Sequence, residues 1–218
     1  EREVKATAKL SHWNSIEIFD YGHADDGTFY YVMEFLPGMN MQEMVSRYGP
    51  LTPERVIHLL AQTCDALGEA HEMGLVHRDI KPANIFAAKR GGLYDVAKLL
   101  DFGLVKPVTS IENTQLTQEG SVTGSPLYMS PEQATGDSEP DGRSDIYCLG
   151  AVAYFLLTGR APFDYKQPIK VLIAHSQETP TPPSDFADVP TDLEAVVMKC
   201  LEKDPNERFS NVLEMRNA

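Results

Sequence analysis

The fold of this chain is decided by two short stretches, HRDIKPAN at residues 77–84 and DFG at residues 101–103. Together they put a carboxylate base, a cation and two hard oxygen ligands close together in sequence. Transfer of a phosphoryl group needs these parts, because the protein must orient the acceptor hydroxyl and neutralise phosphate charge. Asp79 can take the proton of the acceptor, and Lys81 can contact the transferred phosphate. Asn84 and Asp101 offer the oxygen ligands that Mg²⁺ prefers.

The order of these motifs, ending in Ser130-Pro131-Glu132, resembles that of the eukaryotic-like (Hanks-type) serine/threonine protein kinases of bacteria. In that family residues 77–84 would be the catalytic loop, residues 101–103 the metal-binding triplet and residues 130–132 the Ala-Pro-Glu-like motif. Lys81, two residues after Asp79, is the serine/threonine form of the loop. The resemblance covers essentially all 218 residues. It implies a transferase that uses ATP and Mg²⁺ to phosphorylate Ser and Thr hydroxyls on protein substrates in signal transduction.

The fold class that follows from the resemblance is α+β, a protein-kinase-like fold of two lobes. Residues 1–36 would be the remnant of the small lobe, from helix C through the hinge, and residues 37–218 the mostly helical large lobe. Glu3 matches the glutamate that pairs with a strand lysine in the family. The Gly-rich loop and the Val-Ala-Ile-Lys strand that begin the family pattern are not in the sequence. We therefore expect a fragment of a longer chain that is inactive on its own.

Two alternatives stay open beside the enzyme. A pseudokinase would fold in the same way and act as a binding or scaffold module without phosphoryl transfer, and sequence upstream of residue 1 would discriminate between the two. A small-molecule phosphotransferase of related fold is the other alternative. The segment Gly124-Ser125-Pro126, which resembles the platform that positions a peptide acceptor, argues against it.

The resemblance also implies where the nucleotide binds. Residues 33–36 match the hinge, with Met33 as gatekeeper and main-chain groups of Glu34 and Leu36 bonding adenine. Phe86 would cover the lower face of the base, although plain core packing would also explain Met33 and Phe86. The implied ATP-binding set is Glu3, Met33, Glu34, Leu36, Lys81, Asn84, Phe86 and Asp101, of which Asn84 and Asp101 bind the metal.

Regulation and scaffolding follow from the same resemblance. Arg78, directly before Asp79, would receive a phosphate on the activation loop, for which Ser121 and Thr123 are the expected acceptors. His77 would be structural. The family uses an aspartate to brace the catalytic loop and a buried ion pair to hold the activation segment, and these roles are expected of Asp145 and of the pair Glu132–Arg208.

Composition limits the partners. The 19 Lys and Arg against 32 Asp and Glu give a net charge of −13, which argues against nucleic acid or an anionic membrane surface as a partner. The three cysteines have no zinc-type spacing and fall in apolar helical patterns, so we expect buried thiols in a reducing, cytoplasmic compartment. The longest apolar run is too short to span a bilayer, so we expect no membrane contact from this segment, and membrane anchoring of the parent protein through a segment outside it stays open. Any dimer would form through the small lobe or through regions outside this chain.

The pattern of apolar residues predicts the main elements. Residues 16–21 and 28–35 read as two strands joined by Asp26-Gly27, and residues 85–87 and 97–100 as short strands around Gly91-Gly92. A helix is expected to start at the cap Thr52 and to stop at Gly74. Residues 144–157 predict a helix buried all round, and residues 104–129 a long loop. Thr191 is expected to cap an amphipathic helix, and the chain stops at Asn217-Ala218 inside what reads as a last helix.

Overall fold

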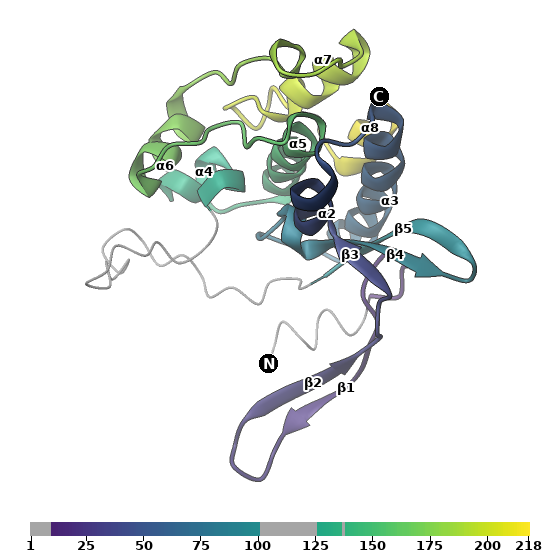
Figure 1. Ribbon diagram of the computed structural model, residues 1–218. Coiled ribbons are helices and arrows are strands. Elements are labelled where there is room, and N and C mark those ends of the chain that lie inside the picture. Colours follow the sequence, from purple (N-terminus) through teal and green to yellow (C-terminus); the bar gives the residue numbers. More distant parts are fainter. Residues whose placement is uncertain (1–9, 101–125, 137) are drawn as a thin grey trace.

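The computed structural model describes residues 10–100, 126–136 and 138–218. A mostly helical body is joined to two small sheets, one of which stands well away from the helices (Figure 1). The architecture is the α+β arrangement expected, and in the described residues the strands lie within 18–40 and 85–99 and the α-helices within 41–72 and 131–217. Glu3, Asp101, Ser121 and Thr123, together with the predicted loop at 104–129 up to residue 125, lie outside the described residues.

The core of the helical body is built around α5 (Gly142–Thr158), in which every residue from Ser144 to Thr158 is buried. This confirms the helix predicted to be apolar all round. α3 (Pro53–Glu72), α7 (Thr191–Cys200) and α8 (Val212–Asn217) pack around it. At Gly150 of α5 an added Cβ would collide with Cβ of Cys200 on α7, so only glycine permits this close approach of the two helices.

Three further helices lie beside this group in the part of the chain that the structure describes. They are α2 (Met41–Tyr48), α4 (Pro131–Thr135) and α6 (Pro168–Gln177), and α4 packs against α6. Among the described residues, 3-10 turns connect larger elements at η1 (Pro82–Asn84), η3 (Pro126–Tyr128) and η4 (Pro183–Asp185). The three cysteines are free and buried, as expected. Within the described residues, no helix is long and apolar enough to cross a membrane.

One sheet lies beneath the helices and carries the strands that flank the catalytic loop. β3 (Gly38–Asn40) pairs with β4 (Ile85–Arg90), which pairs in turn with β5 (Leu93–Leu99), and both pairings are antiparallel. β4 and β5 extend further than the short strands predicted. The reason is that Gly91 and Gly92 both adopt positive φ, so the turn between the strands is tight and pairing continues to Arg90 and Leu93.

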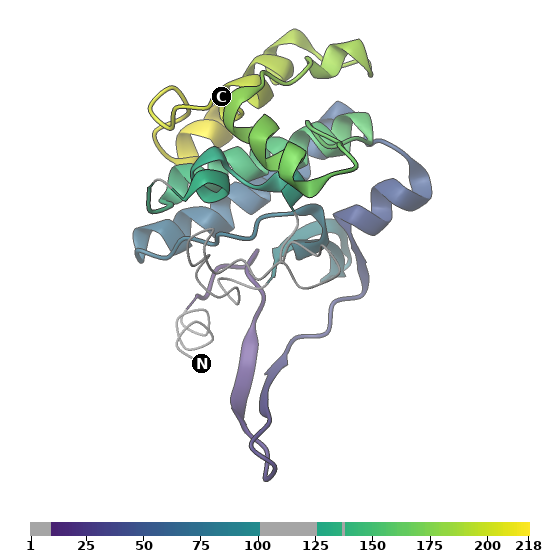
Figure 2. The same cartoon turned by 90° about the vertical axis from the view of Figure 1, so that its left-hand side faces the viewer.

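The second sheet is a hairpin of β1 (Ile18–His23) and β2 (Phe29–Met33) that projects away from the helices in both views (Figure 1, Figure 2). The Asp26-Gly27 turn is present, with Gly27 at positive φ. The first strand was predicted two residues too early, at 16–21, and the second was predicted too long, at 28–35. Ser15 bridges to Leu99 and Ile16 donates to the Leu99 carbonyl, so this part of the chain pairs with β5 rather than within the hairpin.

Two predicted caps need correction. Thr52 is the N-cap of α3, but its exposed side chain makes no capping hydrogen bond. Pro190, not Thr191, is the N-cap of α7, since its extended backbone suits that position and Thr191 is already helical. Glu194 in the first turn of α7 accepts from the Ser184 backbone N–H, and acidic residues there also suit the helix dipole. α3 ends at Glu72, with Gly74 at positive φ two residues later.

Candidate active site

The loop at residues 77–84 is anchored from below by the buried carboxylate of Asp145, near the start of α5. Its two oxygens accept the backbone N–H groups of His77 and Arg78, each at 2.9 Å. His71 of α3 contacts the same carboxylate at 2.8 Å through Nε2. The two backbone N–H groups of the loop and the imidazole of His71 thus all contact the Asp145 carboxylate. These contacts agree with the bracing role expected of Asp145.

His77 is fully buried and structural, as expected. Its Nε2 lies 2.8 Å from the Leu100 carbonyl, at the end of β5, and its Nδ1 accepts the backbone N–H of Asp79 at 3.2 Å. The imidazole therefore ties the loop to the strand that precedes residue 101. Both ring nitrogens are used in this way, so His77 positions its neighbour and does not exchange protons with a substrate.

The carboxylate of Asp79 is held by two donors. Lys81 Nζ lies 2.6 Å from Asp79 Oδ2, and Asn84 Nδ2 donates to the same oxygen at 2.9 Å. Asn84 also donates to the Asp79 carbonyl at 2.9 Å, which closes the loop onto itself through the 3-10 turn η1. The side chain of Asp79 is 21% exposed, so it is both positioned and accessible. The sequence-predicted base, cation and metal ligand are brought together here.

The donor set suits Mg²⁺. The amide nitrogen of Asn84 is engaged with Asp79, which leaves its side-chain oxygen as the group for a metal, and an amide oxygen is a hard ligand of the kind Mg²⁺ takes. The second predicted ligand, Asp101, follows Leu100, whose carbonyl is fixed by His77. In the part of the chain that the structure describes, no group of three or more His, Cys, Asp or Glu side chains could hold a metal instead.

The predicted hinge, residues 33–36, connects β2 to β3. The Glu34 backbone N–H donates to the Glu17 carbonyl at 3.0 Å. Met33 is 45% exposed and Phe35 is 89% exposed, so neither is packed in a core. Phe86 lies on β4 between Asn40 of β3 and Lys98 of β5 and is partly buried. The contacts with adenine remain predictions.

Sequence reasoning missed the partners of the Glu34 side chain, which is 7% exposed and lies against two cations. Lys98 Nζ from β5 is 2.6 Å from Glu34 Oε1 and also donates to the Ser15 carbonyl at 3.0 Å, while Arg90 pairs with the other oxygen. Trp13 stacks on the Arg90 guanidinium. Burial, followed by the nearby Arg90 charge, lowers the pKa of Lys98 to about 8. The available signal was a lysine inside the apolar run at 96–100.

A buried ion pair holds the segment that follows the activation loop. Arg208 forms two hydrogen bonds with Glu132 of α4, at 2.8 and 2.9 Å, and Ser144 of α5 donates to the same carboxylate. Burial pushes the pKa of Glu132 up, but the hydrogen bonds from Arg208 and Ser144 outweigh it, so the pKa lies below its usual value. The pair expected between Glu132 and Arg208 is present.

Arg78 is the regulatory cation expected from the sequence, and its guanidinium is accessible. Nη2 lies 3.3 Å from Glu139, with 44% of the Arg78 side chain and 86% of the Glu139 side chain exposed. An exposed pair of this kind contributes little stability, so the guanidinium can exchange Glu139 for a more strongly charged anion at small cost.

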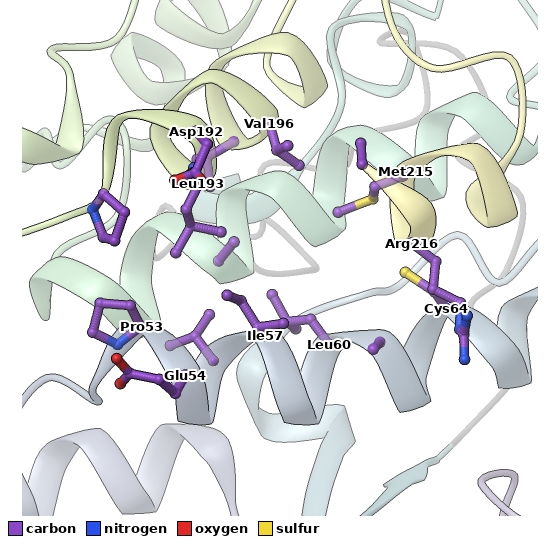
Figure 3. A pocket seen from close by; sticks show the side chains of 16 residues that line it. Pro53, Glu54, Ile57, Leu60, Cys64, Asp192, Leu193, Val196, Met215 and Arg216 are labelled. Atoms are coloured by element: carbon purple, nitrogen blue, oxygen red, sulfur yellow. The ribbon is translucent and has the colours of Figure 1, made fainter.

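A separate apolar cavity of about 250 Å³ lies between α3, α7 and α8 (Figure 3). Ile57 and Leu60 enter it from α3, Leu193 and Val196 from α7, and Met215 from α8. The loop at residues 77–84 does not line it. Its chemistry is that of an apolar groove, so it does not contribute to the polar site described above.

Comparison with known proteins gives a consistent result. The family model described as "Protein kinase domain" matches residues 1–217. The serine/threonine-protein kinase PknB of Mycolicibacterium smegmatis is 40% identical over 99% of this chain and 34% of its own length. The serine/threonine-protein kinase pkn3 of Myxococcus xanthus is 39% identical over 95% of this chain and 39% of its own length. The chain thus spans about a third of the length of the curated relatives that it matches.

Solved structures agree. The kinase domain of Mycobacterium tuberculosis PknI matches with a TM-score of 0.75 and 27% identity over 99% of this chain and 75% of that one. Rad53 1-466 in complex with AMP-PNP matches with a TM-score of 0.80 and 25% identity over 99% of this chain and 53% of that one. The chain therefore has the protein kinase fold. The chain belongs to the protein kinase family, in its bacterial Hanks-type serine/threonine branch.

Proposed function

We propose that the protein containing this chain transfers the γ-phosphoryl group of ATP to Ser or Thr hydroxyls of protein substrates. The observation that carries the proposal is the Asp79 carboxylate held by Lys81 and Asn84 at 2.6 and 2.9 Å. A base, a phosphate-binding cation and a metal ligand are the parts that phosphoryl transfer requires, because catalysis there is mainly positioning and charge neutralisation.

Each side chain has a defined task in this reaction. Asp79 orients the acceptor hydroxyl and receives its proton, and Lys81 stabilises charge on the transferred phosphoryl group. Asn84, with Asp101, would hold Mg²⁺, which when bound neutralises charge on the nucleotide phosphates. Asp145 keeps the loop backbone in place through two N–H groups. Glu34 and Leu36 would contribute main-chain groups to adenine, with Met33 and Phe86 beside the base and Glu3 on the small-lobe side.

The test is a phosphorylation assay with labelled ATP on the full-length protein and its Asp79→Asn variant. Asn keeps the shape and removes the base, so we expect turnover to fall by at least ~10²-fold, in line with general-base contributions, while ATP binding is retained. Asp101→Asn should instead impair ATP binding in the presence of Mg²⁺. Asp188→Asn, at an exposed aspartate, is the matched control. Near wild-type turnover in Asp79→Asn would remove the role assigned to Asp79.

A pseudokinase would fold in the same way, but it would not need a base, a cation and a metal ligand held together in the catalytic loop. Here Asp79, Lys81 and Asn84 are present and in contact, and the backbone beneath them is anchored. This arrangement favours the enzyme. Partners are proposed accordingly, as protein substrates and not nucleic acid, given the net charge of −13. The three free thiols suit a reducing compartment, so we propose the cytoplasm for this part of the protein.

We also propose that phosphate on Ser121 or Thr123 activates the enzyme by pairing with Arg78. The support is the accessible Arg78 guanidinium, whose present partner, Glu139, is an exposed single charge. A phosphate brings about −1.5 to −2 charges and three acceptor oxygens, so it competes well for an arginine. Autophosphorylated protein should carry phosphate at one of the two sites by mass spectrometry, and the double Ala variant should lose activity. Full activity in that variant would exclude the switch.

A further inference from the structure

The backbone immediately before the proposed base is in an unfavourable conformation. Arg78 has φ 65°, in the left-handed region that residues with a Cβ rarely adopt. Such a conformation persists only where the surroundings impose it, and it is common where a backbone must aim a functional group. Whatever holds Arg78 in this conformation also sets the direction in which Asp79 leaves the loop.

One side of the Arg78 residue is held by Asp145, which accepts its N–H at 2.9 Å. The Arg78 carbonyl is held by a side chain from a different helix. Gln133 of α4 donates from Nε2 to the Arg78 carbonyl at 2.8 Å, across 55 residues of sequence. The two polar groups flanking the strained φ/ψ pair are therefore both bonded, one to α5 and one to α4.

The Gln133 amide is itself held in one orientation. Its Oε1 accepts the Ser130 backbone N–H and the Ser130 hydroxyl, both at 3.0 Å, and the Cys148 thiol at 3.5 Å. These three donors surround the oxygen. A flip of the amide would place its NH2 group, which is also a donor, against them, so Nε2 stays directed at the Arg78 carbonyl. Ser130 and Gln133 form the capping box of α4, and Glu132 beside them is locked by Arg208.

We propose that Gln133 is a positioning residue for Asp79. It transmits the placement of α4, at the end of the activation segment, to the backbone of the catalytic loop by bonding the Arg78 carbonyl. The inference rests on the proposed function, because it assigns a role in the reaction of Asp79. The Gln133 contact is a second clamp, meaning a hydrogen bond that fixes the Arg78 backbone, in addition to the one from Asp145. The capping box of α4 would then stabilise the helix and also position Asp79 for the reaction.

Three variants of the full-length protein separate positioning from helix capping. Gln133→Glu keeps the acceptor oxygen for Ser130, since Glu is the usual partner in a capping box, but has no N–H for Arg78. Gln133→Met loses both contacts. Ser130→Ala weakens the cap and keeps the Gln133 donor. Gln177→Glu, at the exposed end of α6, controls for the added charge.

For Gln133→Glu and Gln133→Met we expect kcat to fall by about tenfold, with the KM for ATP changed less than twofold, because misplacement of a catalytic group by a fraction of an ångström costs rate. Ser130→Ala should lower the melting temperature more than Gln133→Glu does, yet reduce kcat less. Amide hydrogen exchange at Arg78 and Asp79 should be faster in both Gln133 variants and unchanged in Gln177→Glu.

Wild-type kcat in Gln133→Glu, with wild-type exchange at Arg78, would overturn the inference. A kcat loss that follows the melting temperature across all three variants would also overturn it, since it would show a role in helix capping alone. If wild-type protein itself does not phosphorylate any substrate while Gln133→Glu still speeds exchange at Arg78 and Asp79, the clamp stands and the proposed function fails.

Discussion

The catalytic loop and the hairpin leading to the hinge are held in opposite ways. The loop at 77–84 is fixed on several sides, by the buried carboxylate of Asp145 on α5, by the partly exposed Gln133 of α4 and by the Leu100 carbonyl directly after β5. The hairpin β1–β2 projects from the body and shows large apolar side chains to solvent, with Phe19 60% exposed. One region is rigid through its surroundings, and the other depends on its own ladder of backbone bonds.

The difference matches the two tasks that we propose for the site. In the proposed reaction the acceptor hydroxyl and the phosphoryl group need groups fixed within a fraction of an ångström, and the candidate groups Asp79, Lys81 and Asn84 belong to the body. The predicted adenine contacts lie at residues 33–36, where the hairpin leads into the body, and this connection runs through Glu34 and its partners Lys98 and Arg90. Several apolar side chains of the hairpin are exposed, among them Phe19, Tyr30 and Val32. The hairpin should therefore be the more adaptable half of the site.

The largest effect is expected in the rigid region, at the buried pair Glu132–Arg208. Glu132→Gln leaves the guanidinium of Arg208 buried without its counter-charge, which typically costs about 3–5 kcal/mol of unfolding free energy. Urea denaturation followed by circular dichroism measures the loss. Asp65→Asn, which removes the partner of Arg216 in a more exposed pair, should cost no more than about 1 kcal/mol. Equal losses in the two variants would show that burial of Glu132–Arg208 has no special weight.

The same pair predicts how stability depends on acid. The folded pKa of Glu132 lies below its usual value, so near that value the unfolded chain binds more protons than the folded one. The stability contributed by the ionised carboxylate is present above the unfolded pKa and is lost as pH falls through the folded pKa. The difference in unfolding free energy between wild type and Glu132→Gln should therefore shrink below about pH 4.5. A difference that stays constant down to pH 2 would contradict the assignment.

The loop at 77–84 and its supports could be predicted from the sequence better than the hairpin β1–β2 and its connection to the body. The catalytic loop depends on residues close together in sequence, so the motif singled out Asp79, Lys81 and Asn84, and the structure brings these three side chains into contact. The family resemblance supplied two long-range partners, Asp145 and Arg208. The buried helix α5 was predicted because an all-apolar pattern has one physical meaning, which is burial on every side.

The missed features are polar contacts across long sequence separations. Lys98 lies in an apolar strand and reads as an outward-facing residue, but its partner Glu34 is 64 residues away. Gln133 could have been recognised with Ser130 as a capping box, yet nothing local indicates the Arg78 carbonyl. Side-chain capping was also predicted wrongly at two helix starts. Thr52 is an N-cap without a capping hydrogen bond, and Thr191 lies inside α7, where Pro190 is the N-cap.

A middle-sized effect is expected where the two regions join. Lys98→Met removes the cation from Glu34 Oε1 and from the Ser15 carbonyl, leaving Arg90 and the Glu17 backbone N–H as partners of the Glu34 carboxylate. The hinge should loosen against β5, so the KM for ATP should rise by about tenfold while kcat falls less, because the loop geometry is untouched. Steady-state kinetics of the full-length protein measure both. Lys89→Met, at a lysine stacked on Tyr94, is the control and should leave the KM unchanged. A loss confined to kcat would place Lys98 in the catalytic half of the site.

The smallest effect is expected on the hairpin itself. Phe19→Ser in the chain of residues 1–218 should change the unfolding free energy by no more than about 0.5 kcal/mol, because a side chain that is 60% exposed gives up little burial when it is removed. Leu156→Ala, at a fully buried position of α5, should cost about 2–5 kcal/mol in the same denaturation experiment. In the full-length protein the comparison becomes sharper. If another segment covers the hairpin face there, Phe19→Ser will cost more in the full-length protein than in the shorter chain, and the excess measures that contact. Equal small losses in both would show that the face is free, and a large loss in the short chain would contradict the exposure of Phe19.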